Sequence, residues 1–340
     1  MKKISIYIVV FLIGMLPMFS QSISELKKNY SGKIKWIEKT KTIEFVKSGV
    51  VFFENKTGTG KDLENDQKNH FWTVPQEVKN IIIGNNVTVT VAFQTSSDIM
   101  ISGRDRKKSI VYGTDLQQWA DANNPGKQNL KEWHYSQFEN RGGVMSIKNL
   151  TVLNPFSYFV QGFGHVVHVK SCDFIDDRGG NQNHSDGFVG GNGSTVDDCY
   201  FEAGDDVFKA YFDYSVSNCT IKMVENAVPI QLGWGNYSNG AVCNFKNLKI
   251  IGDSGRGATD NAVIDGRAGK FTVTINIDGL EVDNQNAVMV SLWDKTMTLN
   301  GTITNAKIKV KQYSKRRTAG VNNLKICDSV EQKANYDCKQ

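Results

Sequence analysis

A six-residue pattern recurs seven times between residues 147 and 308 and constrains the fold more than any other feature. It reads apolar, any, small or polar, then Leu, Cys or Ala, any, apolar. Successive copies begin 22, 27, 20, 29, 32 and 26 residues apart, close to one coil of a parallel β-helix with loops of variable length. The copies are Ile147–Val152, Val169–Phe174, Val196–Phe201, Val216–Ile221, Phe245–Ile250, Ile277–Val282 and Ile303–Ile308.

Each position of the repeat has an expected place in such a coil. The third residue, for example Asn149 or Asn218, should lie where the strand bends, because Asn, Asp, Ser and Gly tolerate turn conformations. The fourth and sixth residues should point inward and stack on their counterparts in neighbouring coils. Leucine-rich repeats have some of these spacings, but their Leu-x-x-Leu-x-Leu signature is missing.

A second set of β-rich stretches lies between the copies of the repeat, which predicts two strand ladders per coil. We therefore expect an all-β chain with a right-handed, single-stranded parallel β-helix over residues 81–340, including a C-terminal tail. Residues 21–80 alternate poorly and are expected to cap the open end of the solenoid. The second set begins at Asp186-Gly187-Phe188, Asp206-Val207-Phe208, Asn226-Ala227-Val228, Asn261-Ala262-Val263 and Asn286-Ala287-Val288.

The first 20 residues have the pattern of an export signal. Lys2 and Lys3 precede an almost uninterrupted apolar run, Ile4 to Met18, which is short for a membrane span. We therefore expect a secreted or periplasmic protein without membrane contact after cleavage, and a monomer. Without the leader the formal charge falls from +5 to +3, which is too weak and too scattered a bias to indicate nucleic acid as a partner.

Three of the six cysteines occupy the fourth position of the repeat. Cys172, Cys199 and Cys219 would thus form one inward row, with adjacent coils about 4.8 Å apart. That distance does not forbid a disulfide, but stacked side chains that point the same way are poorly aimed at each other. We expect buried free thiols here and leave the state of Cys243 open.

The C-terminal tail contains a disulfide candidate. Cys327 and Cys338 lie close together in the sequence of a chain that is expected to be exported. A bridge between them would hold an end that otherwise frays, so we predict that they pair.

Three aspartates stand one coil apart in the most informative stretch. Asp186 precedes Asp205 and Asp206 by 19 and 20 residues, so the three should be neighbours on one face of the solenoid. Clustered carboxylates raise at least one pKa, and a carboxyl group that stays protonated is what a general acid needs. Glycosidic cleavage combines such an acid with a second carboxylate. Simple turn formation and calcium binding are the alternatives.

The motifs around these aspartates resemble glycoside hydrolase family 49, the dextranases and isopullulanases. The resemblance implies an inverting hydrolase of dextran-like α-glucans. It makes Asp205 the general acid and lets Asp186 and Asp206 activate water. Family members usually carry an N-terminal β-sandwich, for which residues 23–80 are too few. The matching motifs are Asp186-Gly187, then Asp205-Asp206-x-x-Lys209-x-Tyr211, then Pro229-Ile230-Gln231-x-Gly233-Trp234.

The same resemblance implies which residues bind the sugar. Lys209 would bind hydroxyl groups near the cleavage point, and Tyr211, Gln231 and Trp234 would line the cleft. Four further residues are candidates for sugar binding because of their positions. Three belong to the second ladder or follow it along the same face, and the fourth lies just before Asp186. These are Asp265, Arg267, Trp293 and His184.

Three other functions remain open. Polygalacturonases share the layout of the aspartates, but their Gly-His-Gly and Arg-x-Lys motifs are missing after Asp206. A polysaccharide lyase would need a basic residue as proton acceptor, for which Lys209 and Arg267 are the obvious candidates. A non-catalytic glycan-binding β-helix would use the aspartates for turns or calcium. For the hydrolase we expect neither cofactor nor metal.

Overall fold

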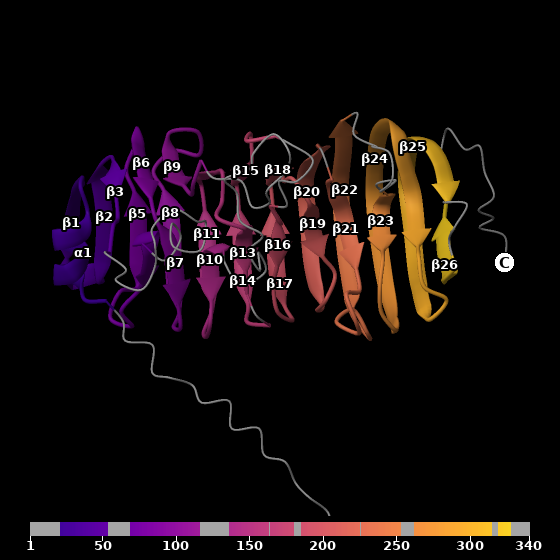
Figure 1. Cartoon of the computed structure of the whole chain (residues 1–340), viewed down its shortest axis with the longest axis horizontal. Helices are drawn as coiled ribbons and strands as arrows, with labels where there is room; N and C mark the ends of the chain where they lie inside the picture. Colours follow the sequence, from indigo (N-terminus) through magenta and orange to yellow (C-terminus); the bar gives the residue numbers. More distant parts are fainter. Residues whose placement is uncertain are drawn as a thin grey trace, which may run out of the picture.

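The repeat builds a parallel β-helix that runs the length of the molecule (Figure 1). The structure, a computed structural model, describes residues 21–53, 69–115, 136–162, 164–179, 185–224, 226–252, 262–314 and 319–327. These residues form 26 strands, a short 3-10 helix, Glu38–Thr40, and one α-helix, α1, Ile23–Asn29. None of their helices has the length and apolar character that a membrane span needs. The export signal expected in residues 1–20 lies outside the described residues.

Three ladders of parallel strands follow the solenoid axis, and each coil contributes one strand to each ladder. Ladder A contains β2 (Thr42–Lys47), β5 (Asn80–Ile83), β8 (Ile99–Gly103), β11 (Met145–Lys148), β14 (Val167–Lys170) and β17 (Ser194–Asp197). Ladder B contains β3 (Gly49–Val50), β6 (Val87–Thr90), β9 (Ser109–Tyr112), β12 (Thr151–Leu153), β15 (Asp173–Ile175) and β18 (Tyr200–Glu202).

Ladder C carries the second set of β-rich stretches. It contains β4 (Phe71–Thr73), β7 (Ala92–Thr95), β10 (Ser136–Asn140), β13 (Tyr158–Gln161), β16 (Phe188–Val189), β19 (Asp206–Lys209), β21 (Val228–Leu232) and β23 (Ala262–Gly266). In the later coils longer strands continue ladders A and B together. They are β20 (Tyr214–Met223), β22 (Val242–Gly252), β24 (Phe271–Leu292) and β25 (Met297–Ser314), before β26 (Val321–Ile326) ends ladder A.

The third position of the repeat is a bend in all seven copies, as predicted. Its residues have φ between 52° and 82°, the left-handed region that Asn, Asp and Gly enter most readily. This bend separates ladder A from ladder B, so each repeat spans two faces of the coil. The prediction of two ladders per coil is therefore wrong, and the coil has three. The bend residues are Asn149, Ser171, Asp198, Asn218, Asn247, Gly279 and Asn305.

We expect the bend to tolerate Asn and Gly but not a β-branched residue. Asn218 has φ 53°, and its side chain donates to Asp197 and accepts from Asn247, at 2.8 and 2.9 Å. Asn218→Val should lower the free energy of unfolding by about 1–2 kcal/mol, whereas Asn218→Gly should cost much less. Urea unfolding measures both, and Ser215→Val, at an exposed position of the same strand, is the control. Equal stability of the Val and Gly variants would contradict this explanation of the repeat.

The interior of the solenoid is filled by the fourth and sixth positions, which are buried in every copy. Rings stack along the axis, with the centroids of Phe174 and Phe201 4.7 Å apart. Four cysteines are free and buried, which confirms the expected thiols and answers the open question about the fourth: Cys172, Cys199, Cys219 and Cys243. Cys327 is disulfide-bonded. Its predicted partner Cys338 lies outside the described residues, so the pairing stays a prediction.

The N-terminal end combines a cap with the first coil. Strand β1, Lys33–Ile37, pairs antiparallel with β2, whereas β2 already pairs in parallel with β5. Helix α1 begins with a capping box, in which Ser22 and Glu25 exchange hydrogen bonds. Residues 21–80, expected to form a cap alone, thus contain both the cap and the start of the parallel ladders.

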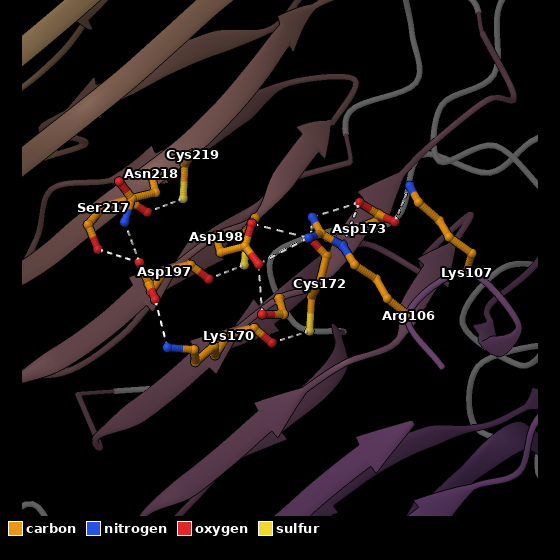
Figure 2. Close-up of polar contacts among 12 residues, drawn as sticks. Arg106, Lys107, Lys170, Cys172, Asp173, Asp197, Asp198, Ser217, Asn218 and Cys219 are labelled. Carbon is orange, nitrogen blue, oxygen red and sulfur yellow. Dashed lines mark hydrogen bonds and ion pairs between the residues drawn. The ribbon is translucent and has the colours of Figure 1, made fainter. Parts of the chain in front are cut away.

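An arginine ties four successive coils together on the outer wall, and Figure 2 shows its contacts with Asp173, Asp198 and Cys172. Arg106, between β8 and β9, bonds the nearly fully buried carboxylate of Asp173 and both oxygens of Asp198 at 3.1–3.2 Å. It also donates to the carbonyl of Cys172, and its own carbonyl accepts from the Thr151 hydroxyl. These partners belong to the coils of β12, β15 and β18. Arg106 therefore contacts coils beyond its immediate neighbour, whereas contacts in a solenoid are usually limited to adjacent coils.

Candidate active site

Ladder C brings the three predicted aspartates together. Asp206 begins β19 and Asp186 lies two residues before β16, and because Phe188 is in register with Phe208, Asp186 stands opposite Asp206 in the adjacent coil. Gly187 is required between them, because a Cβ there would lie 2.3 Å from the carbonyl oxygen of Val207. The Asp-Gly pair is thus part of the close packing of two coils.

Lys209 lies between two of these carboxylates. Its Nζ is 2.6 Å from Asp206 Oδ2 and 3.1 Å from Asp186 Oδ1, and it sits over the ring of Tyr158 at 5.4 Å. Asp186, Asp206 and Lys209 are all buried. Burying like charges is costly unless a counter-charge accompanies them, and Lys209 supplies that charge.

The buried carboxyls hold protons unusually well. Burial raises the pKa of Asp186 to about 8 and that of Asp206 to about 6, although Lys209 opposes both shifts. Burial alone would lower the pKa of Lys209, but Asp186 and Asp206 outweigh it and raise that pKa well above its ordinary value. The two carboxyls titrate as a pair, so near neutral pH the cluster holds one exchangeable proton.

Asp205 is the most accessible of the three aspartates. It is half-buried, whereas Asp186 and Asp206 are buried. The side-chain amide of Asn226 donates to its Oδ1 at 2.8 Å, and its own backbone N–H donates to Ser185 at 2.9 Å. An oriented carboxyl group at the surface of the cluster can reach a bound substrate, which a general acid requires.

A row of polar side chains continues from Lys209 along ladder C. The strand register places Lys209 beside Gln231, Gln231 beside Asp265, and Asp265 beside Ser291. Asp265 is paired with Arg267 at 3.0 Å, and the Arg267 guanidinium lies 5.4 Å from the ring centre of Trp293. The predicted side chains Gln231, Asp265, Arg267 and Trp293 therefore share one face with the aspartates.

Exposed aromatic side chains gather beside this row. Among the described residues four aromatic side chains are largely exposed, and three follow strands of ladder C or its continuation in β24: Trp234 (48%), Tyr237 (65%) and Trp293 (37%). Trp234 has φ 52° between two glycines with positive φ, a costly conformation for a bulky residue. Tyr211 stacks on Tyr237 with centroids 5.3 Å apart. Apolar ring faces of this kind suit pyranose rings.

Several residues that the structure adds to the site were not predicted as site residues. Tyr158, Asn226 and Tyr237 are outside the quoted motifs, yet they contact Lys209, Asp205 and Tyr211, respectively. Beyond Val189, the same register places polar residues again at Gln161 and Glu139. Glu139 is buried, pairs with Arg141 and accepts from Gln94 at 3.1 Å. Glu139 and Gln94 precede the first clear copy of the repeat, so the spacing could not place them.

The structure leaves the predicted role of His184 untested and bears on the calcium alternative only for the described residues. His184 lies outside the described residues. Among the residues that are described, no group of three or more His, Cys, Asp or Glu side chains is placed to hold a metal ion. Between Asp186 and Asp206, the position that a cation would take is filled by the ammonium group of Lys209.

Comparison with known proteins gives only remote likenesses. No protein-family model matches the chain, and no curated protein matches it. Dex49A from Penicillium minioluteum is similar with 14% identity and a TM-score of 0.47, over 85% of this chain and 60% of that one. The Agl-KA catalytic domain is similar with 9% identity and a TM-score of 0.35, over 84% and 61%. This chain thus spans about 60% of the length of either structure, and at these values the likeness assigns no chemistry to it.

Proposed function

We propose that this chain is an exported glycoside hydrolase that cleaves α-glucosidic linkages in a neutral, dextran-like polysaccharide with inversion. The observation that carries the proposal is the buried Asp186–Lys209–Asp206 cluster beside the accessible carboxyl of Asp205. This arrangement places an accessible carboxyl, that of Asp205, beside a carboxylate whose ionised form Lys209 favours, that of Asp206, and glycosidic cleavage needs such an acid and base.

Each aspartate has a proposed role. Asp205 donates its proton to the leaving oxygen, because it is the most accessible and is oriented by Asn226. Asp206 accepts a short hydrogen bond from Lys209, which favours its ionised form, so it takes the proton from the attacking water, and Asp186 helps to hold that water. Sugar rings in the neighbouring positions stack on Trp234, Tyr237 and Trp293.

The charge of the face supports a neutral rather than an anionic substrate. The cations described along the polar row, Lys209, Arg267 and Arg141, each contact a carboxylate. Together with Asp205, the carboxylates outnumber these cations, so a uronate chain would meet net repulsion. This arrangement disfavours polygalacturonate and also a lyase, which would have to neutralise the carboxylate of its substrate.

A polysaccharide panel tests the proposal. The purified mature chain should release reducing ends from dextran or another α-glucan and leave polygalacturonate intact. Proton NMR at early times should show the β-anomer of the new reducing end, because inversion of an α-linkage yields β product. An α-anomer at early times would contradict inversion. Ultraviolet absorbance from an unsaturated product would identify a lyase. If no polysaccharide in the panel is cleaved, glycan binding without catalysis would be favoured.

A further inference from the structure

The contacts of Lys209 point inward, to other side chains of the protein, rather than to the sugar that its motif suggests. The side chain is buried, and a lysine ammonium has three donors. Two directions are taken by Asp206 and Asp186, and the face of Tyr158 lies on a further side. Nζ therefore lies between two carboxylates of the protein, on a side chain that is almost fully buried.

We infer that Lys209 is a positioning residue, the internal counter-ion that fixes Asp186 and Asp206 opposite each other and leaves the pair with a single negative charge. This inference rests on the proposed function and assigns Lys209 a part in it. With one carboxylate balanced by the ammonium and the other protonated, the buried cluster is neutral. Without Lys209, either both carboxyls take up protons or an unbalanced charge stays buried.

The surroundings of the cluster agree with this charge balance. Burial raises the pKa of Asp186 to about 8 and of Asp206 to about 6, so the second proton is lost only near or above neutral pH. Other charged or titratable groups face the cluster, but they oppose each other, since Asp205 raises and Arg267 lowers the pKa of Asp206. The groups that face it are Asp205, Tyr158 from β13, Tyr211 after β19, and Arg267 with Asp265 from β23.

Thermal unfolding at two pH values tests the inference without any substrate. Lys209→Met should lower Tm by roughly 5–10 °C at pH 8 and by much less at pH 5, where both carboxyls can be protonated. Adding Asp206→Asn to Lys209→Met should recover most of the loss at pH 8, because the carboxylate that Lys209 balances is then removed. The control is Lys222→Met, which breaks the more exposed pair with Glu202 and should change Tm little at either pH.

If Lys209→Met does not fold, Asp186→Asn alone still tests whether the buried pair makes the stability of the protein depend on pH. A carboxyl whose pKa is raised in the folded state stabilises fully below its unfolded value near 4, and this contribution is lost as pH rises toward 8. Asp186→Asn should therefore flatten the fall in Tm between these values. A loss in Lys209→Met that is equal at pH 5 and pH 8 and is not recovered by Asp206→Asn would overturn the counter-ion role.

Kinetics separate a counter-ion from a sugar ligand. In Lys209→Met we expect kcat to fall by about 10²-fold with little change in KM, and the acidic limb of the pH profile to move upward. A raised KM with unchanged kcat and an unchanged pH profile would instead identify a sugar ligand. If the wild-type chain cleaves no glycan, the proposed function fails, while the stability measurements still decide the role of Lys209.

Discussion

Asp205→Asn is expected to reduce kcat on the polysaccharide by about 10³-fold while KM changes little. An amide of the same shape cannot donate a proton to the leaving oxygen, and general acid catalysis contributes about 10²–10⁴-fold. Asn226 can still face the new side chain, so the fold should be kept. Initial rates on the polysaccharide that the wild type cleaves measure the effect, and Asp283→Asn, on the outer wall in β24, is the matched control.

A substrate with an activated leaving group shows whether Asp205 is the acid. A nitrophenyl glycoside departs without much protonation, so Asp205→Asn should lose much less activity on it than on the polysaccharide. Asp206→Asn, which removes the proposed base, should lose activity equally on both substrates. Equal losses in Asp205→Asn would move the acid role to Asp186, whose raised pKa keeps it protonated at neutral pH.

Arg106→Met is expected to lower the free energy of unfolding by about 3 kcal/mol. It removes the contacts that tie Asp173 and Asp198 together and leaves the buried carboxylate of Asp173 with Lys107, at 2.7 Å, and a long contact from the Thr151 hydroxyl, at 3.5 Å. Breaking a buried pair on one side typically costs about 3–5 kcal/mol, and the remaining lysine offsets part of that. Urea unfolding followed by circular dichroism gives the value.

The neighbouring Arg104 provides a control for Arg106. It forms a largely exposed pair with Glu44 at 2.8 Å, so Arg104→Met should cost less than about 1 kcal/mol. Adding Asp173→Asn to Arg106→Met should restore part of the lost stability, since the uncompensated charge is then gone. Similar losses in Arg104→Met and Arg106→Met would contradict the bridging role described for Arg106.

The repeat was enough to predict the architecture but not the shape of the coil. Seven third-position residues such as Asn149 and Gly279 adopt the expected left-handed bend, because few residue types enter that region readily. Alternation of apolar residues does not say on which side of a bend a strand continues. The third ladder, and the entry of β2 into the parallel pairing, therefore appeared only in the structure.

The site was predictable where one coil of spacing separates its residues. Asp186 and Asp206 stand opposite each other because each lies two residues before one of the paired residues Phe188 and Phe208 of ladder C. The role of Lys209 could not be read in this way, because a motif does not show whether an ammonium group points to solvent or to a buried carboxylate. Tyr237 joins the site through a stack with Tyr211, a contact between loops that no periodicity predicts.

The polar row of ladder C also divides this face of the solenoid into steps of one coil each. Each coil advances the chain by about 4.8 Å and adds one largely buried polar side chain beneath this face, whereas the three aspartates belong to only two adjacent coils. Adding or deleting a whole coil would therefore lengthen or shorten the contact with a polymer in fixed steps and leave the reacting groups untouched. In such a scaffold the preferred length of the substrate and the chemistry performed on it can evolve separately.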